Sequence, residues 1–223
     1  GVLAVLGPGR LAPIESVAHA HPGKIDVFEW REESIEALTY GVRKVKLDER
    51  IVVSRIDLEA HVFKPSTYDG LVSVDDFAYC GYPPHLAQQV MKCLKPGAAA
   101  SIECYVGFRG PELATAFASS FAEPQIRAHG DILQFFIDAG LKLENDEDLT
   151  GEIMHFARRG FKELSGRLSG AELNVHAARE LAWEAEAWRT RLKLLGQRRL
   201  ERRRFLVRKP AGDQAENANA PGG

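Results

Sequence analysis

Hydrophobic residues divide the chain into short apolar runs and longer stretches in which apolar positions recur at helical spacing. Apolar runs of roughly four to eight residues are typical of buried strands, whereas apolar positions three and four apart form one face of a helix. The two patterns alternate as far as residue 104, which predicts βαβ units and a mostly parallel sheet. The predicted strands are 2–6, 25–29, 50–56, 70–74 and 98–104, and the predicted helices between them are 14–20, 32–39 and 86–94.

The second half of the chain adds two longer helices to this pattern. A helix at 131–139 ends before Gly140, a residue type favoured directly after a helix, and a strand is expected at 141–144. Amphipathic helices follow at 151–168 and 171–195, and 204–207 is a last short strand. We therefore expect a doubly wound α/β domain over residues 1–210, with a helical cap at about 151–195 over a substrate pocket. Residues 211–223 have nothing to bury and are expected to form a disordered tail.

Composition narrows the classes of partner. With 223 residues, 45% of them hydrophobic, the chain can bury one sizeable core. The formal net charge of -2 argues against an obligate nucleic-acid or anionic-membrane partner, because such partners demand an excess of Lys and Arg. No apolar run approaches the roughly 20 residues of a bilayer span. The chain begins with Gly1 and enters a strand at once, so we expect it to be a domain of a longer protein.

Cysteine and histidine give no sign of a metal site. The three cysteines, Cys80, Cys93 and Cys104, lack C-x-x-C spacing, and the seven histidines show no H-x-x-x-H pair. Neither a disulfide framework nor a zinc site is expected, and a reducing cytoplasm is the expected location.

A glycine loop and an acid together predict a nucleoside site. The first predicted strand runs into Gly7 and Gly9, and glycine allows the backbone to approach a ligand closely before a helix begins. About 20 residues further on, the second predicted strand ends at Glu29, where a carboxylate can accept hydrogen bonds from both hydroxyls of a ribose. Either feature alone is weak evidence, but their spacing fits one site.

Three further residues are candidates for contacts to an adenine ring. Trp30 can offer an aromatic face, Asp57 can accept a hydrogen bond from an exocyclic amine, and Leu58 follows Asp57 directly. An equally good interpretation makes Trp30 a helix-packing aromatic and Asp57 the cap of a helix.

Catalytic residues are harder to identify. Tyr79, Tyr82 and Asp75 follow the fourth predicted strand, at the sheet edge where α/β proteins bind ligands. Either tyrosine can position an acceptor, and Asp75 can take a proton from it. Aromatic packing and an Asp-capped turn explain the same residues without a catalytic role.

At this point the sequence resembles the class I, Rossmann-like S-adenosylmethionine-dependent methyltransferases. The resemblance covers nearly the whole chain and rests on the glycine loop at 5–9, the acid Glu29, the fourth strand at 68–73 and the segment 90–97, which ends in Leu-Lys-Pro-Gly. It implies a seven-stranded sheet whose last strand is antiparallel, and methyl transfer from S-adenosylmethionine to a small-molecule acceptor. Gly7, Gly9 and Glu29 would then hold the cofactor, and Trp30, Asp57 and Leu58 would place its adenine.

Two positions depart from the family pattern. Its glycine loop usually opens with an acid and closes with a third glycine, where this chain has Val5 and Leu11. The missing acid would help to hold the cofactor's amino group, and Leu11 brings bulk where the backbone passes close to the ligand. Two alternatives therefore stay open: a degenerate, non-catalytic module that binds a partner, and an NAD-dependent oxidoreductase, which shares the glycines and the acid. The sequence indicates neither the acceptor nor the oligomeric state, and a homodimer is one of the states left open.

Overall fold

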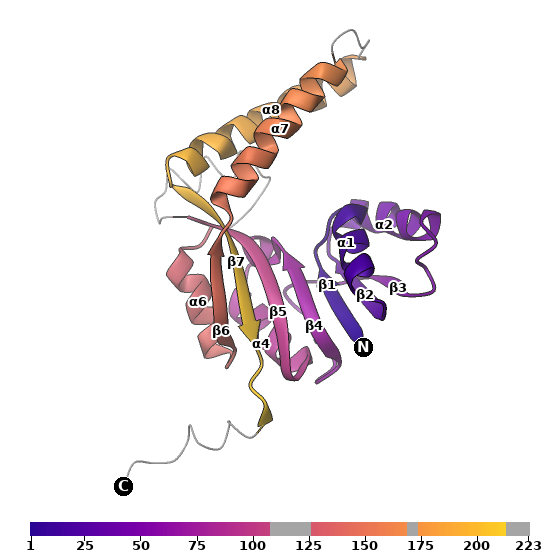
Figure 1. Ribbon diagram of the computed structural model, residues 1–223, viewed down its shortest axis with the longest axis vertical. Helices are drawn as coiled ribbons and strands as arrows, with labels where there is room; N and C mark the ends of the chain where they lie inside the picture. The colour runs from indigo at the N-terminus through magenta and orange to yellow at the C-terminus, as the bar shows by residue number, and fades with distance from the viewer. Residues whose placement is uncertain (108–125, 169–173, 213–223) are drawn as a thin grey trace. The chain divides into compact units, whose positions relative to one another are not determined.

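The computed structural model describes residues 1–107, 126–168 and 174–212, and strands and helices alternate through most of them (Figure 1). In chain order the elements are β1 (Val2–Leu6), α1 (Leu11–Ala20), β2 (Lys24–Glu29), α2 (Glu32–Lys44), β3 (Ile51–Arg55), β4 (Tyr68–Val74), α3 (Asp76–Tyr79), α4 (Pro83–Cys93), β5 (Leu94–Gly107), α6 (His129–Asp138), β6 (Lys142–Asp148), α7 (Thr150–Leu168), α8 (Val175–Gly196) and β7 (Leu200–Arg208).

The described strands form one seven-stranded sheet in the order β3-β2-β1-β4-β5-β7-β6 (Figure 1). The sheet is mostly parallel, and β7 runs antiparallel to its neighbours. The predicted doubly wound α/β architecture and the antiparallel last strand are confirmed.

Pairing brings the carboxyl ends of the first four strands to one edge of the sheet. Leu6 at the end of β1 lies opposite Phe28 of β2 and Ser73 of β4, and Glu29 at the end of β2 lies opposite Arg55 of β3. The segments that leave these ends are the glycine loop, the start of α2, the turn after β3 and the helix α3. All the predicted site residues therefore belong to one edge.

The boundary predicted before the fifth strand is wrong. The strand predicted at 98–104 begins earlier, because residues 95–97 lie inside β5, which starts at Leu94 and pairs there with Tyr68. The register then shifts, so that the next paired residue of β4, Gly70, lies opposite Ala99. Pro96 has no N–H to donate to a ladder, and Gly97 has a φ of 78°, so this stretch forms an irregularity within the strand.

An apolar cluster anchors this edge of the sheet. Its buried members come from β1, β2, β3, α1 and α2, and they are Val5, Ile14, Ala18, Ile25, Val27, Leu38, Val42 and Ile51. Burying each large aliphatic side chain contributes about 1.5–3 kcal/mol. Phe136 of α6 packs edge-on against Phe77 of α3, with ring centroids 5.3 Å apart, and against Phe205 of β7, 5.6 Å away. The strand ends that carry the site therefore rest on well-packed helices.

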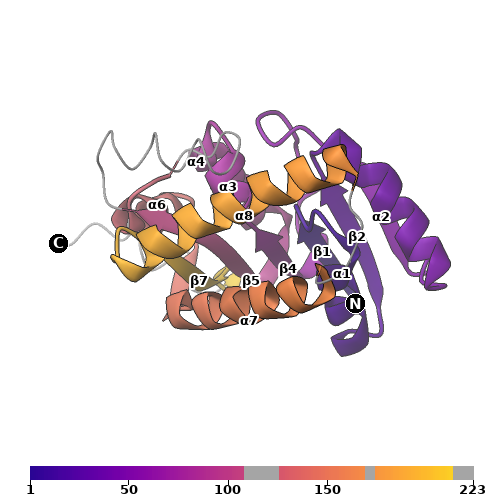
Figure 2. The same cartoon turned by 90° about the horizontal axis from the view of Figure 1, so that it is seen from above.

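The chain divides into two compact units, one of Gly1–Cys104, Gly130–Asp146 and Arg204–Gly223, the other of Tyr105–His129 and Glu147–Arg203. In the second unit α7 and α8 lie side by side (Figure 2), and Leu194 of α8 packs with Tyr105 and Leu200 in a small core. The helices predicted at 151–168 and 171–195 are thus present, although 169–173 lie outside the described residues. Their covering of a substrate pocket stays a prediction. The expected tail, 211–223, is outside the described residues from 213 onward.

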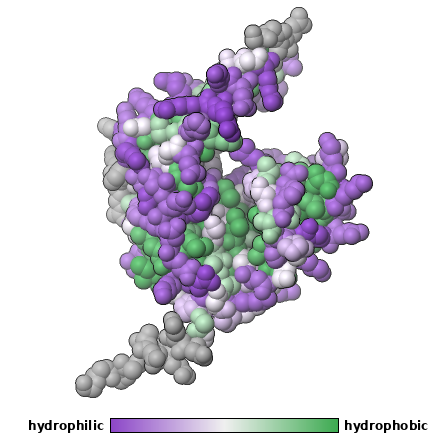
Figure 3. All heavy atoms as spheres, viewed as in Figure 1, coloured by the Kyte–Doolittle hydropathy of each residue, from purple (hydrophilic) through white to green (hydrophobic). Residues whose placement is uncertain are grey.

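Hydrophilic side chains cover most of the face seen in Figure 3, and apolar ones show over the strands and beside α1 and α2. Within the described ranges, none of the helices is long and apolar enough to cross a membrane.

Candidate functional site

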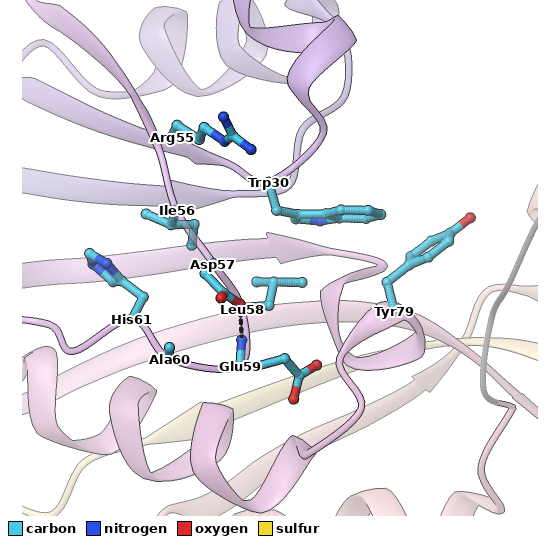
Figure 4. A pocket seen from close by; sticks show the side chains of 9 residues that line it. All are labelled: Trp30, Arg55, Ile56, Asp57, Leu58, Glu59, Ala60, His61 and Tyr79. Carbon is cyan, nitrogen blue, oxygen red and sulfur yellow. Dashed lines mark hydrogen bonds between the residues drawn. The ribbon is translucent and has the colours of Figure 1, made fainter.

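An open pocket of about 640 Å³ lies at the carboxyl ends of β2 and β3 (Figure 4). Its size falls in the range of small-molecule sites, which is roughly 300–1,000 Å³. The residues that line it are Trp30, Arg55, Ile56, Asp57, Leu58, Glu59, Ala60, His61 and Tyr79. The structure therefore brings together the three residues predicted to contact adenine, and it adds Tyr79.

The walls of the pocket suit a flat aromatic ligand. In Figure 4 the Trp30 indole faces the Leu58 side chain, and the Tyr79 ring lies beside the indole with its centroid 4.9 Å away. Asp57 is exposed, and one of its carboxylate oxygens accepts the Glu59 N–H at 2.9 Å. Asp57 thus caps a turn, whereas the sequence interpretation made it the cap of a helix, and it lines the pocket at the same time.

The charged groups of the pocket are mainly acidic on the side of the β3 turn. Asp57 and Glu59 lie there, whereas the Arg55 guanidinium is 3.3 Å from Glu32. Partial burial lowers the pKa of His61, which keeps its ring neutral at neutral pH. This side favours a hydrogen-bond donor, such as an exocyclic amine, over an anion.

Both glycines of the loop are needed for its shape. Gly7 and Gly9 have φ values of 54° and 62°, in the left-handed region that favours glycine. A Cβ on Gly7 would also collide with the carboxylate of Asp76. The Gly7 N–H donates to the Phe28 carbonyl at 2.9 Å, which ties the loop to β2.

Glu29 lies where the sequence predicts it, and its carboxylate is fully buried. One oxygen, Oε2, accepts the Gly9 N–H at 2.8 Å, and the other, Oε1, accepts the backbone N–H groups of Trp30 at 3.0 Å and Arg31 at 2.9 Å. The Arg31 guanidinium nitrogen Nη1 lies 3.1 Å from Oε1 and 3.2 Å from Oε2. Both oxygens of the predicted ribose acid are therefore already paired with protein donors.

Sequence reasoning missed Arg31. Its guanidinium stacks over the Trp30 ring at 4.1 Å and lies 5.4 Å from the centre of the Tyr79 ring. Nη1 is 3.5 Å from the Gly7 carbonyl, and a Cβ on Gly9 would come within 3.1 Å of it. The arginine thus lies against the glycine loop. The sequence signal that could have indicated the Arg31–Glu29 contact is an arginine two positions after the predicted ribose acid.

A second buried carboxyl lies behind Trp30. Asp76, the first residue of α3, accepts the Trp30 indole N–H at 3.1 Å and the Ser73 hydroxyl at 2.6 Å. Burial raises the pKa of Asp76 to about 7, although the Ser73 hydrogen bond and the Arg31 charge act in the opposite direction. This carboxyl therefore titrates near neutral pH and holds one wall of the pocket.

Among the three catalytic candidates, Tyr79 is the one that lines the pocket. Tyr82 is 61% exposed, and its backbone N–H donates to Glu59. Asp75 has a left-handed φ of 68°, and its N–H donates to the Glu103 carbonyl at 2.8 Å. Neither Tyr82 nor Asp75 is among the lining residues.

Val5 and Leu11, the two positions that depart from the family pattern, both pack in the apolar core. Val5 is fully buried in the apolar cluster of β1, β2 and β3, so an apolar side chain stands where the family pattern has an acid. Leu11 packs on the same cluster, and its Cδ2 would lie 3.1 Å from a Cβ on Gly41 of α2. The Leu11 side chain is therefore directed at α2.

The described residues contain no cluster of three His, Cys, Asp or Glu side chains suited to a metal ion.

No family model matches the sequence, and no curated protein is similar to it. Solved structures, in contrast, match nearly the whole chain.

A phosphoethanolamine N-methyltransferase 2 of Haemonchus contortus, in complex with S-adenosyl-L-methionine, matches with a TM-score of 0.79 at 18% identity, over 94% of this chain and 48% of that one. A geranyl diphosphate C-methyltransferase of Streptomyces coelicolor A3(2) matches with a TM-score of 0.73 at 11% identity, over 93% of this chain and 72% of that one. The chain has the class I S-adenosylmethionine-dependent methyltransferase fold.

The same fold occurs in the [4+2]-cyclase SpnF, which matches with a TM-score of 0.75 at 16% identity, over 95% of this chain and 76% of that one. At such identities the likeness shows the methyltransferase fold alone, and the activity of this chain has to be argued from its own residues.

Proposed function

We propose that the protein binds S-adenosylmethionine in the pocket of Trp30, Asp57 and Leu58 and transfers its methyl group to a small-molecule acceptor. The observation that carries this proposal is the meeting of these three side chains around one pocket, next to the glycine loop and the buried Glu29. The fold supports it as well, since methyltransferases of two chemistries share it.

The residues present fit the parts of this cofactor. The Trp30 indole and the Leu58 side chain provide two apolar walls for an adenine, and the exposed Asp57 carboxylate can accept from its exocyclic amine. Glu29 is the proposed acceptor for the ribose hydroxyls, and the loop of Gly7 and Gly9, tied to Glu29 through the Gly9 N–H, would adjoin the remainder of the cofactor. When bound, S-adenosylmethionine supplies an electrophilic methyl group, so the protein's main task is to align an acceptor with it.

Tyr79 is the side chain best placed to help with that alignment. It lines the pocket beside Trp30, and a phenol can both donate and accept a hydrogen bond. In this proposal Tyr79 orients the acceptor, whereas Tyr82 and Asp75 have no direct part.

Trp30→Ala and Asp57→Asn test the adenine wall. Loss of a stacking side chain from a base costs about 1–3 kcal/mol, so Trp30→Ala should weaken S-adenosylmethionine binding by about tenfold or more. Equilibrium binding of radiolabelled cofactor measures this. Tyr40→Ala, which removes an exposed aromatic side chain from α2, is the matched control and should bind like the wild type. Equal binding by the wild type and both pocket variants would contradict the proposed site.

A second candidate is a ligand-binding protein that transfers no methyl group. Val5, buried in the apolar core, leaves the loop without its usual acid, and SpnF, named a [4+2]-cyclase, has the same fold. Release of S-adenosylhomocysteine in the presence of amine, hydroxyl, thiol and carbon acceptors distinguishes the two. Turnover of the cofactor supports methyl transfer, and tight cofactor binding without turnover on any acceptor supports the second candidate.

A further inference from the structure

Arg31 holds the same two oxygens that a ribose would need. Its Nη1 lies 3.1 Å from Oε1 and 3.2 Å from Oε2 of Glu29, so one nitrogen bridges the carboxylate. The Arg31 side chain is 21% exposed, while Glu29 is fully buried. Such a charge-assisted contact to a buried carboxylate is among the stronger interactions a side chain can make.

The other donors to Glu29 are less able to leave. The N–H groups of Trp30 and Arg31 belong to the backbone that connects β2 to α2, and the N–H of Gly9 belongs to the glycine loop. Of the contacts to this carboxylate, those of the Arg31 guanidinium alone can be broken by side-chain rotation. A ligand that bonds Glu29 must therefore take the place of Arg31.

We propose that Arg31 competes with the ligand's ribose for Glu29, and that this competition lowers the pocket's affinity for ribonucleosides more than its affinity for 2′-deoxyribonucleosides. The inference rests on the proposed function, because it assumes a nucleoside ligand in this pocket. Two adjacent hydroxyls replace both contacts of Nη1, one on each oxygen. A deoxyribose offers one hydroxyl and has to replace only one contact of Nη1, so Arg31 lowers its affinity by less than it lowers the affinity of a ribose.

After displacement from Glu29, the Arg31 guanidinium can stay in contact with the neighbouring aromatic rings. It already stacks on the Trp30 ring at 4.1 Å and lies near the Tyr79 ring, and both rings attract a cation over their faces. Rotation away from Glu29 keeps part of this stacking, which lowers the free energy needed to open the site.

Arg31→Met tests the inference, because methionine keeps an apolar stem beside Trp30 and cannot donate to Glu29. Calorimetric titration with adenosine and with 2′-deoxyadenosine gives two affinities for each protein. We expect Arg31→Met to bind adenosine about tenfold more tightly than the wild type, and its ratio of adenosine to 2′-deoxyadenosine affinity to rise by about threefold. Arg43→Met, at the exposed far end of α2, should leave both quantities unchanged.

A buried carboxylate without its cation can prevent folding, so Arg31→Lys is the second variant. A lysine keeps the charge but loses the planar group that stacks on Trp30, and both quantities should shift in the same direction by a smaller factor. Thermal unfolding shows which variants are folded. Unchanged affinity and ratio in a folded variant would overturn the competition and leave the proposed function standing. Failure of every folded protein, wild type included, to bind either nucleoside would overturn both.

Discussion

At the scale of single residues, two buried carboxyls organise the site. Glu29 and Asp76 are both fully buried, and Trp30 connects them, since its backbone N–H donates to Glu29 and its indole N–H to Asp76. Arg31 lies between Glu29 and the glycine loop. The positions of Gly7, Gly9 and Glu29 could be predicted from the sequence because the ends of parallel strands share an edge. The Trp30–Asp76 and Arg31–Glu29 contacts could not, because they depend on side-chain rotamers.

Asp76 should make the protein's stability depend on pH. Its pKa is raised from 3.8 to about 7 in the folded protein, so between these values the folded state binds a proton that the unfolded state has lost. The contribution of Asp76 is therefore fully present below the unfolded pKa, declines as the pH rises, and levels off above the folded pKa. Asp76→Asn lacks this dependence.

Urea unfolding of the wild type and Asp76→Asn over this pH range measures the effect. We expect the free energy of unfolding of the wild type, relative to the variant, to fall as the pH rises from about 4 to about 7. A difference that stays constant over this window would show that Asp76 is ionised throughout.

At the scale of elements, the carboxyl ends of the strands position the site residues, and the helices packed on the sheet hold those strands in place. Strongly periodic segments such as β2 and α2 could be predicted well, because their apolar faces repeat. The start of β5 could not, since Pro96 and Gly97 are typical turn residues. In the structure Leu94 pairs with Tyr68 of β4, and the Gly97 N–H donates to the carbonyl of Lys209, directly after β7. The helix α3 was also missed, because Asp76–Tyr79 is too short to show a period.

The glycine that follows α6 allows a test of why this helix ends where it does. Gly140 follows α6 with a φ of 83°, as the sequence predicts for a residue after a helix. Gly140→Ala places a side chain in the left-handed region and should lower the free energy of unfolding by about 1 kcal/mol.

Gly130, near the start of the same helix, is the matched control. A Cβ there meets nothing within 4 Å, and alanine is the better helix former, so Gly130→Ala should be neutral or stabilising by up to about 1 kcal/mol. Equal destabilisation by both substitutions in urea unfolding would mean that the left-handed backbone at Gly140 is not what the glycine provides.

At the scale of the whole molecule, the sequence indicates the fold and the proposed cofactor site better than it indicates a site for the methyl acceptor. The resemblance based on the glycine loop, Glu29 and the segment before the fifth strand implied the observed seven-stranded sheet with its antiparallel last strand, because those features mark βαβ connections along the chain. An acceptor site has no comparable motif in the sequence. Tyr79, Tyr82 and Asp75 could be proposed only from their position after the fourth strand, and of these three Tyr79 lines the pocket.

Isothermal titration with S-adenosylhomocysteine, with NAD as the competing ligand class and Glu29→Gln as the site variant, tests the central claim most directly. The account predicts one bound S-adenosylhomocysteine per chain, an affinity at least about tenfold weaker in Glu29→Gln, and no comparable heat with NAD. Binding of NAD in preference to S-adenosylhomocysteine, or binding of neither ligand by the folded wild type, would contradict it.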